Sequence, residues 1–216
     1  MQLLCNVAVN RRRRKIIMIL NHLWGLYAHP VEEWHTIDNR HESFKYSLSH
    51  IMIIALIPSL CSYFSLTTTG WSVGVGEPLR MSSDSAMLLG IGMYFALIAG
   101  VFLLGYLAHW MAHTFGAEPT YTQTLELAAY TATPLFMAGF AALYPEVWFV
   151  MIVGLVALAY SVYLLYAGVP ILMHIPEERG FIYSSSVVTC GLILLVCIMT
   201  AFAMFWSSGY APAFSH

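Results

Sequence analysis

The chain has 216 residues, of which 59% are hydrophobic and only 9% are charged, and its mean hydropathy is +0.72. A soluble globular domain carries about 25% charged residues, so this composition excludes an ordinary soluble protein. Several apolar runs exceed the ~18 residues that mark a membrane-spanning helix. The sequence therefore predicts an all-α, polytopic membrane protein whose main partner is the lipid bilayer, and no nucleic-acid partner is expected.

The chain divides into four predicted regions. Residues 1–17 form a basic N-terminal extension, and 18–46 form a cytoplasmic segment at the membrane interface. Residues 47–206 form a membrane domain of five transmembrane helices, and 207–216 form a short tail. The five predicted spans are 47–68, 86–114, 123–144, 147–173 and 182–206.

The N-terminal extension contains the run "RRRRK" at 11–15, directly after a short apolar stretch. This order is the reverse of a signal peptide. Two interpretations remain open: the run anchors the chain to anionic lipid, where each basic residue gains about 1 kcal/mol, or the natural start is Met18.

Aromatic residues are scattered through the polar segment that follows, which is too short and too polar to cross a membrane. Trp24, Tyr27 and Trp34 among polar neighbours predict one or two short helices lying in the interface. Pro30 is expected to begin the second of them.

Two prolines interrupt the apolar sequence around the third span. Tyr144-Pro145-Glu146 predicts a tight hairpin between the third and fourth spans. Pro134 lies inside the third span, where the missing amide predicts a kink. Thr131 and Thr133 are placed to bond the carbonyl that the proline leaves open.

The orientation follows from the basic residues. Eight of them precede the first span or separate the fourth from the fifth: Arg11, Arg12, Arg13, Arg14, Lys15, Arg40, Lys45 and Arg179. Only Arg80 falls on the opposite side. The positive-inside rule therefore predicts a cytoplasmic N-terminus and, with five spans, a periplasmic C-terminus.

Polar residues collect in the cytoplasmic halves of the spans, and their burial in a bilayer is costly. Glu126, Tyr130 and Thr133 share one face of the third span, while Tyr163 and Ser185 lie on the fourth and fifth. One interpretation is a cytoplasm-facing polar cavity, as in transporters. The other, which we favour, is that hydroxyls and an interfacial carboxylate hold the helices together.

Histidines suggest a metal-binding version of the cavity. His109 and His113 are four residues apart on the second span, and His29 and Glu33 lie in the cytoplasmic segment. Imidazole and carboxylate suit zinc or a similar divalent ion. No dense ligand motif supports the idea, so no cofactor is expected, with a divalent metal as the alternative.

Small residues repeat at four-residue spacing, at Gly92, Ala96 and Gly100. Such rows let helices approach closely, and packing inside the bundle is favoured over a homo-oligomer interface. No GxSxG, nucleotide-binding glycine loop or pair of intramembrane aspartates occurs, so we do not expect an enzyme.

The last three predicted spans resemble a known family. "AAYTATPLFMAGFAALYPEVW" and "YSVYLLYAGVPILMHIPEERGFIYSSSV", together with "HLWGLYAHPVEEWHTI" ahead of the first span, resemble the Yip1 family and in particular its bacterial inner-membrane (YohC-like) branch. The resemblance covers about 18–206 and favours Met18 as the start. It implies a five-helix domain with a cytoplasmic N-terminus, and a family-typical kink at Pro134.

The resemblance departs from the eukaryotic pattern in two places. The "GYxxxP" motif of those members is matched at 129–134 with Ala129 in place of glycine, and their acidic "DLYGP" element has no counterpart. The binding of Rab GTPases by eukaryotic members is therefore not carried over.

Two hypotheses for function follow. The first is a non-enzymatic inner-membrane protein that organises the membrane through helix packing and contacts with other membrane proteins. The alternative is a transporter of a small solute or divalent metal ion that uses the cytoplasm-facing polar cavity.

Overall fold

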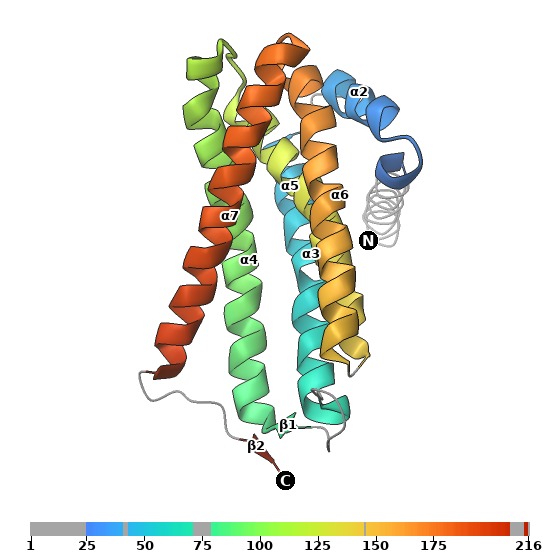
Figure 1. Ribbon diagram of the computed structural model, residues 1–216, viewed down its shortest axis with the longest axis vertical. Helices are drawn as coiled ribbons and strands as arrows, with labels where there is room; N and C mark the ends of the chain where they lie inside the picture. Colours follow the sequence, from blue (N-terminus) through green and yellow to red (C-terminus); the bar gives the residue numbers. More distant parts are fainter. Residues whose placement is uncertain (1–24, 41–42, 71–78, 145, 208–213, 216) are drawn as a thin grey trace, which may run out of the picture.

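The structure is a computed structural model that describes residues 25–40, 43–70, 79–144, 146–207 and 214–215. The basic extension at 1–17, Met18, Trp24 and Pro145 lie outside the described residues. Long helices run side by side along one axis (Figure 1), and the short helix α2, Pro30–Arg40, lies against one end of the bundle. Pro30 begins α2, as predicted.

The first two long helices are α3, Phe44–Phe64, and α4, Ser83–Ala112. A π-helical turn, η1 (Ser65–Thr69), extends α3, and a 3-10 turn, η2 (His113–Phe115), extends α4. Ser82 caps α4, because its side chain accepts a hydrogen bond from the amide of Ser85.

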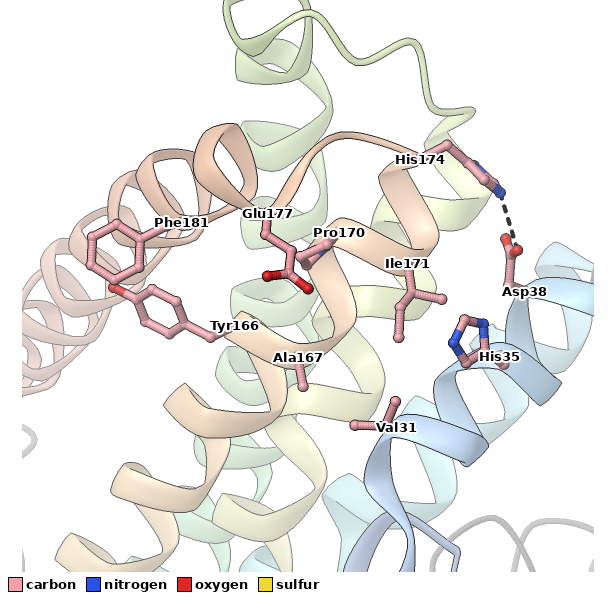
Figure 2. A pocket seen from close by; sticks show the side chains of 10 residues that line it. All are labelled: Val31, His35, Asp38, Tyr166, Ala167, Pro170, Ile171, His174, Glu177 and Phe181. Carbon is pink, nitrogen blue, oxygen red and sulfur yellow. Dashed lines mark hydrogen bonds and ion pairs between the residues drawn. The ribbon is translucent and has the colours of Figure 1, made fainter.

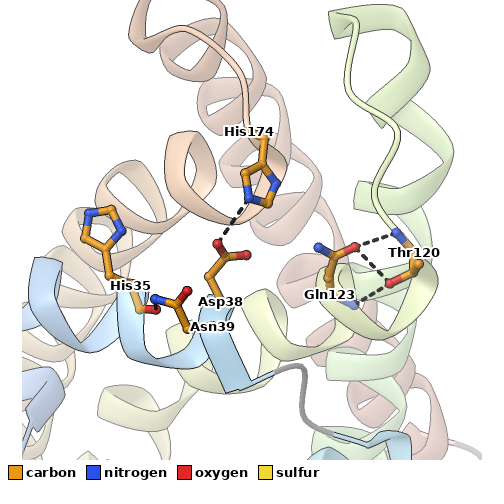
Figure 3. Close-up of polar contacts among 6 residues, drawn as sticks. All are labelled: His35, Asp38, Asn39, Thr120, Gln123 and His174. Atoms are coloured by element: carbon orange, nitrogen blue, oxygen red, sulfur yellow. Dashed lines mark hydrogen bonds and ion pairs between the residues drawn. The ribbon is translucent and has the colours of Figure 1, made fainter.

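Helix α5, Tyr121–Met137, lies in the middle of the bundle and is buried along much of its length. Thr120 and Gln123 form a capping box at its start (Figure 3), in which each side chain bonds the backbone amide of the other. The α-helix continues past Pro134 and tightens to a 3-10 helix, η3 (Ala138–Leu143), four residues later.

The threonines near Pro134 do not bond where the sequence suggested. The Thr131 hydroxyl donates to the carbonyls of Leu127 and Ala128, and the Thr133 hydroxyl donates to that of Ala129. The carbonyl that a proline leaves open is the one four residues before it, at Tyr130. Each threonine therefore bonds a carbonyl three or four residues before itself, and neither of these hydrogen bonds goes to the carbonyl of Tyr130.

The last two long helices are α6, Val147–Met173, and α7, Glu177–Ser207. They are joined by a short connection in which His174 adopts a left-handed conformation, with φ 52°. Helix α7 begins five residues earlier than predicted, because the polar segment "EERGF" is part of the helix.

Within the described residues, four helices are long and apolar enough to cross a membrane: Phe44–Thr69, Ser83–Phe115, Val147–Met173 and Glu177–Phe205. They correspond to the predicted first, second, fourth and fifth spans. The predicted third span, 123–144, corresponds to α5 with η3. Its α-helical part has only 17 residues, so it is not among the four long apolar helices of the described ranges.

Glycines set the closest helix contacts. A Cβ at Gly139 of η3 would lie 2.5 Å from the Cα of Pro58 in α3, so the two backbones touch. On α4, a Cβ at Gly92 would meet Phe202 of α7 at 3.3 Å, and one at Gly100 would meet Ile198 at 3.3 Å. The small-residue row thus packs inside the bundle, as predicted.

The two ends of the bundle carry different structural elements. Helix α2 and the α6–α7 connection lie at one end (Figure 1), which also carries Arg40 and Arg179. At the other end a two-residue strand, β1 (Arg80–Met81), pairs antiparallel with β2 (Phe214–Ser215). The sequence did not predict this pairing, which joins the C-terminal segment to the loop before α4.

Candidate functional site

Helix α2 is docked onto the bundle by two apolar side chains. Trp34 and Ile37 are both 0% exposed, and their three-residue spacing places them on one face of the helix. The Trp34 ring packs onto Gly168 of α6, where a Cβ would lie 2.6 Å from Cε2, and meets the Tyr130 ring edge to face at 6.2 Å. Trp34, from which the sequence predicted only a short helix in the membrane interface, is therefore a core residue that packs against the bundle.

The residues just before α2 are also attached to α6. The Tyr160 hydroxyl donates a 2.7 Å hydrogen bond to the carbonyl of Leu26, and its ring stacks on Tyr27 at 5.4 Å. Burial raises the pKa of Tyr27, and the nearby Tyr160 raises that pKa further. The neutral phenol of Tyr27 is thus the form that fits the docked segment.

The far end of α2 is tied to the end of α6. His174 Nε2 lies 3.1 Å from Asp38 Oδ2 (Figures 2 and 3). The left-handed backbone at His174, unusual for a residue other than glycine, turns the chain from α6 into α7 at this contact. The Asp38 side chain is 17% exposed, and its Oδ1 is buried with no hydrogen bond to any described residue.

Between α2, the end of α6 and the start of α7 lies a groove of about 670 Å³. Figure 2 shows its lining side chains, which come from all three helices. The ten described residues are Val31, His35, Asp38, Tyr166, Ala167, Pro170, Ile171, His174, Glu177 and Phe181. Its volume falls within the ~300–1,000 Å³ range of ligand-binding pockets.

The groove has an apolar part and a polar part. Tyr166 and Phe181 form an aromatic wall, with ring centroids 5.3 Å apart. Asp38 and Glu177 supply carboxylates, and neither lysine nor arginine occurs among the described lining residues. The arrangement suits an amphiphilic ligand whose polar end carries positive charge.

The structure separates the five residues expected to form a polar cavity. Glu126, Tyr130 and Thr133 are buried inside the bundle on α5, with exposures of 1–2%. Tyr163 is 50% exposed on α6. Ser185 on α7 forms a hydrogen bond with Tyr166, with 2.8 Å between the two hydroxyl oxygens. Ser185 therefore contacts a residue that lines the groove but does not line it itself.

His50 of α3 joins the buried polar residues, and the sequence analysis did not single it out. It is 1% exposed, its ring lies 4.8 Å from that of Tyr130, and its Nε2 lies 3.1 Å from Thr133 Oγ1. The single hydroxyl hydrogen of Thr133 goes to Ala129, so Oγ1 accepts from His50 and Nε2 carries the hydrogen. The sequence signal that could have identified His50 is its position as an ionisable residue within the first predicted span.

The proposed metal ligands do not form one cluster. The rings of His109 and His113 lie 6.5 Å apart, and the Glu33 side chain lies against Gly25. His29, the residue just before α2, is exposed. Across the described ranges, no three His, Cys, Asp or Glu side chains are grouped so that they could hold a metal ion.

Comparison with known proteins identifies the family. The Yip1 domain matches residues 24–198, most of the chain. The chain belongs to the Yip1 family. It is 35% identical over 192 residues to inner membrane protein YohC of Escherichia coli K12 and, equally, to that of E. coli O6:H1 strain CFT073, covering 88% of this chain and 98% of each relative. No solved structure matches the chain.

The Yip1 match begins one residue before the described N-terminal segment and therefore includes α2. The docked helix is thus part of the Yip1 domain and not an appendage to it. Together with the long apolar helices, the match identifies a multi-pass membrane protein whose domain carries the groove.

Proposed function

We propose that this Yip1-family chain is a non-enzymatic inner-membrane protein that organises the membrane by holding a partner in the groove between α2, α6 and α7. The observation that carries the proposal is the docking of α2, which creates a ligand-sized, mixed apolar and acidic groove. The relatives named inner membrane protein YohC support the location.

Five crossings of the membrane are part of the proposal. The 17 residues of α5 and the six of η3 together rise about 38 Å, from ~1.5 Å per α-helical and ~2.0 Å per 3-10 residue. This exceeds the ~30 Å hydrocarbon core. An odd number of crossings places the termini on opposite sides, and Arg40 and Arg179 favour a cytoplasmic location for the α2 end.

Photo-crosslinking in the native membrane tests the proposal. A photoreactive residue replaces Ile171, which lines the groove, or Leu155 of the same helix, which is 64% exposed. We expect Ile171 to give one discrete adduct, whereas Leu155 should give the mixture of lipids that surrounds the helix. Identical adduct patterns at both positions would show that the groove selects no partner from its surroundings.

A transporter is the second candidate, because two ionisable side chains are buried in the bundle. His50 is 1% exposed and Glu126 is 2% exposed, and such residues inside membrane helices commonly mark ion or substrate pathways. On this view the polar residues of α3 and α5 would open toward the cytoplasm.

Flux measurements separate the two candidates. Liposomes containing the purified chain should take up protons and zinc no faster than protein-free liposomes, because the polar residues on α5 are buried between helices. Saturable uptake that is lost in Glu126→Gln and in His50→Ala, and kept in Glu178→Gln, would favour the transporter.

A further inference from the structure

The groove lies at the depth of the lipid headgroups. The 27 residues of α6 are about 40 Å long, which matches the ~40–45 Å thickness of a bilayer with its headgroup layers. The lining residues of α6 lie within the last two turns and at the connection, from Tyr166 to His174. That stretch therefore meets the headgroup layer when α6 spans the membrane.

The size of the groove favours a headgroup over a helical peptide. A helix of ~12 residues with side chains occupies about 1,700 Å³, from a diameter of ~11 Å and a rise of ~1.5 Å per residue. The groove offers about 670 Å³. The groove therefore cannot enclose a partner helix, of which only one face would enter, whereas it can enclose a polar headgroup with the first part of its acyl chains.

The charges in the groove select the headgroup. When ionised, the carboxylates of Asp38 and Glu177 can only accept hydrogen bonds; the Asp38 side chain is 17% exposed, and Glu177 is exposed. A primary ammonium group offers three N–H donors, whereas a choline group offers none. His35, on the α2 wall, supplies a ring N–H for a phosphate.

The remaining lining is apolar, at Val31, Ala167, Ile171 and Phe181. These side chains suit the glycerol and first methylenes of a lipid. We propose that the groove binds a phospholipid with a primary-amine headgroup of the ethanolamine type, its ammonium attracted by the negative charge of the two lining carboxylates, Asp38 and Glu177. This inference rests on the proposed function, since it names the partner that the groove holds.

Native mass spectrometry of the full chain in detergent tests the assignment. Phosphatidylethanolamine, phosphatidylcholine and phosphatidylglycerol with identical acyl chains are titrated separately. We expect phosphatidylethanolamine to bind about tenfold more tightly than the other two lipids. A charge-assisted hydrogen bond in a partly solvent-exposed site changes the dissociation constant by on the order of tenfold. Equal binding of the ethanolamine and choline lipids, or tightest binding of the glycerol lipid, overturns the proposal.

Variants assign the preference to the two carboxylates. In Asp38→Asn combined with Glu177→Gln the preference should fall to about one, whereas Glu178→Gln, an exposed neighbour outside the lining, should keep it. Asp38→Asn also weakens the contact of α2 with His174. Glu177→Gln alone leaves that contact intact, and it should still reduce the preference for phosphatidylethanolamine several-fold. A preference that survives both variants contradicts the proposal.

A competing lysine-rich helical peptide separates this inference from the proposed function. If the peptide displaces the ethanolamine lipid at equal concentration, the partner is a protein. In that case the lipid assignment fails, while a discrete adduct at Ile171 would still support the groove as the binding site. Absence of both the lipid preference and the adduct would reject both proposals.

Discussion

At the scale of single residues, Trp34 packs the helix that forms one wall of the groove against the bundle. The sequence places it among polar residues, and the local pattern alone therefore predicted a short helix in the membrane interface. Its burial depends on Gly168, 134 positions later, where the missing side chain leaves room for the indole ring. A pairing between such distant residues leaves no local signal, and this is why α2 could be predicted and its docking could not.

Replacing Gly168 with alanine should detach α2. The new Cβ would lie 2.6 Å from the ring of Trp34, and overpacking of this kind costs about 1–3 kcal/mol. We expect faster backbone hydrogen exchange across Pro30–Arg40. Gly154→Ala on the same helix is the control, because nothing lies within 4 Å of its Cβ position; equal exchange in the two variants would contradict the packing described.

The raised pKa of Tyr27 gives the docked segment a pH dependence. The stabilisation by the neutral phenol is fully present below the ordinary tyrosine pKa of ~10 and is lost as pH rises through the higher pKa of the docked state. Docking measured by hydrogen exchange at 25–40 should therefore weaken above about pH 10.

Tyr27→Phe should remove this part of the pH dependence, and Tyr144→Phe at the opposite end of the bundle should leave it in place. The measurement is the same exchange experiment repeated from pH 8 to pH 11. A loss of docking that is identical in the wild-type chain and in Tyr27→Phe would assign the effect to another group.

At the scale of the elements, the spans follow closely from the sequence, because a long apolar run is a local property. The fourth span, 147–173, coincides with α6, and the first two differ from their helices by three residues or fewer at each end. The third did not follow so simply, since its α-helix changes at Ala138 to a 3-10 helix, whose Gly139 packs against Pro58 of α3.

That contact can be tested at Gly139. A Cβ there would lie 2.5 Å from the backbone of Pro58, which cannot rotate away as a side chain could. We expect Gly139→Ala to lower the thermal unfolding temperature in detergent, with a loss of about 1–3 kcal/mol. Gly154→Ala again serves as the control, and an unchanged unfolding temperature in Gly139→Ala would mean that η3 and α3 are not in backbone contact.

At the scale of the whole molecule, the predicted polar residues and the groove lie in different places. Glu126, Tyr130 and Thr133 share a helix face, which the sequence indicates correctly, but they pack inside the bundle with His50. The groove instead combines residues from α2, α6 and α7. Sequence spacing reports neighbours within one helix, whereas the groove depends on how three helices meet.

The central claim is that the groove holds a partner, and filling the groove tests it most directly. Ala167 lines the groove, so Ala167→Trp should abolish the discrete photo-adduct formed from Ile171 without changing the thermal unfolding temperature. Gly154→Trp, on the same helix in open space, should leave the adduct intact. An adduct that persists at full yield in Ala167→Trp would contradict the claim, since its partner could then not be seated in the groove.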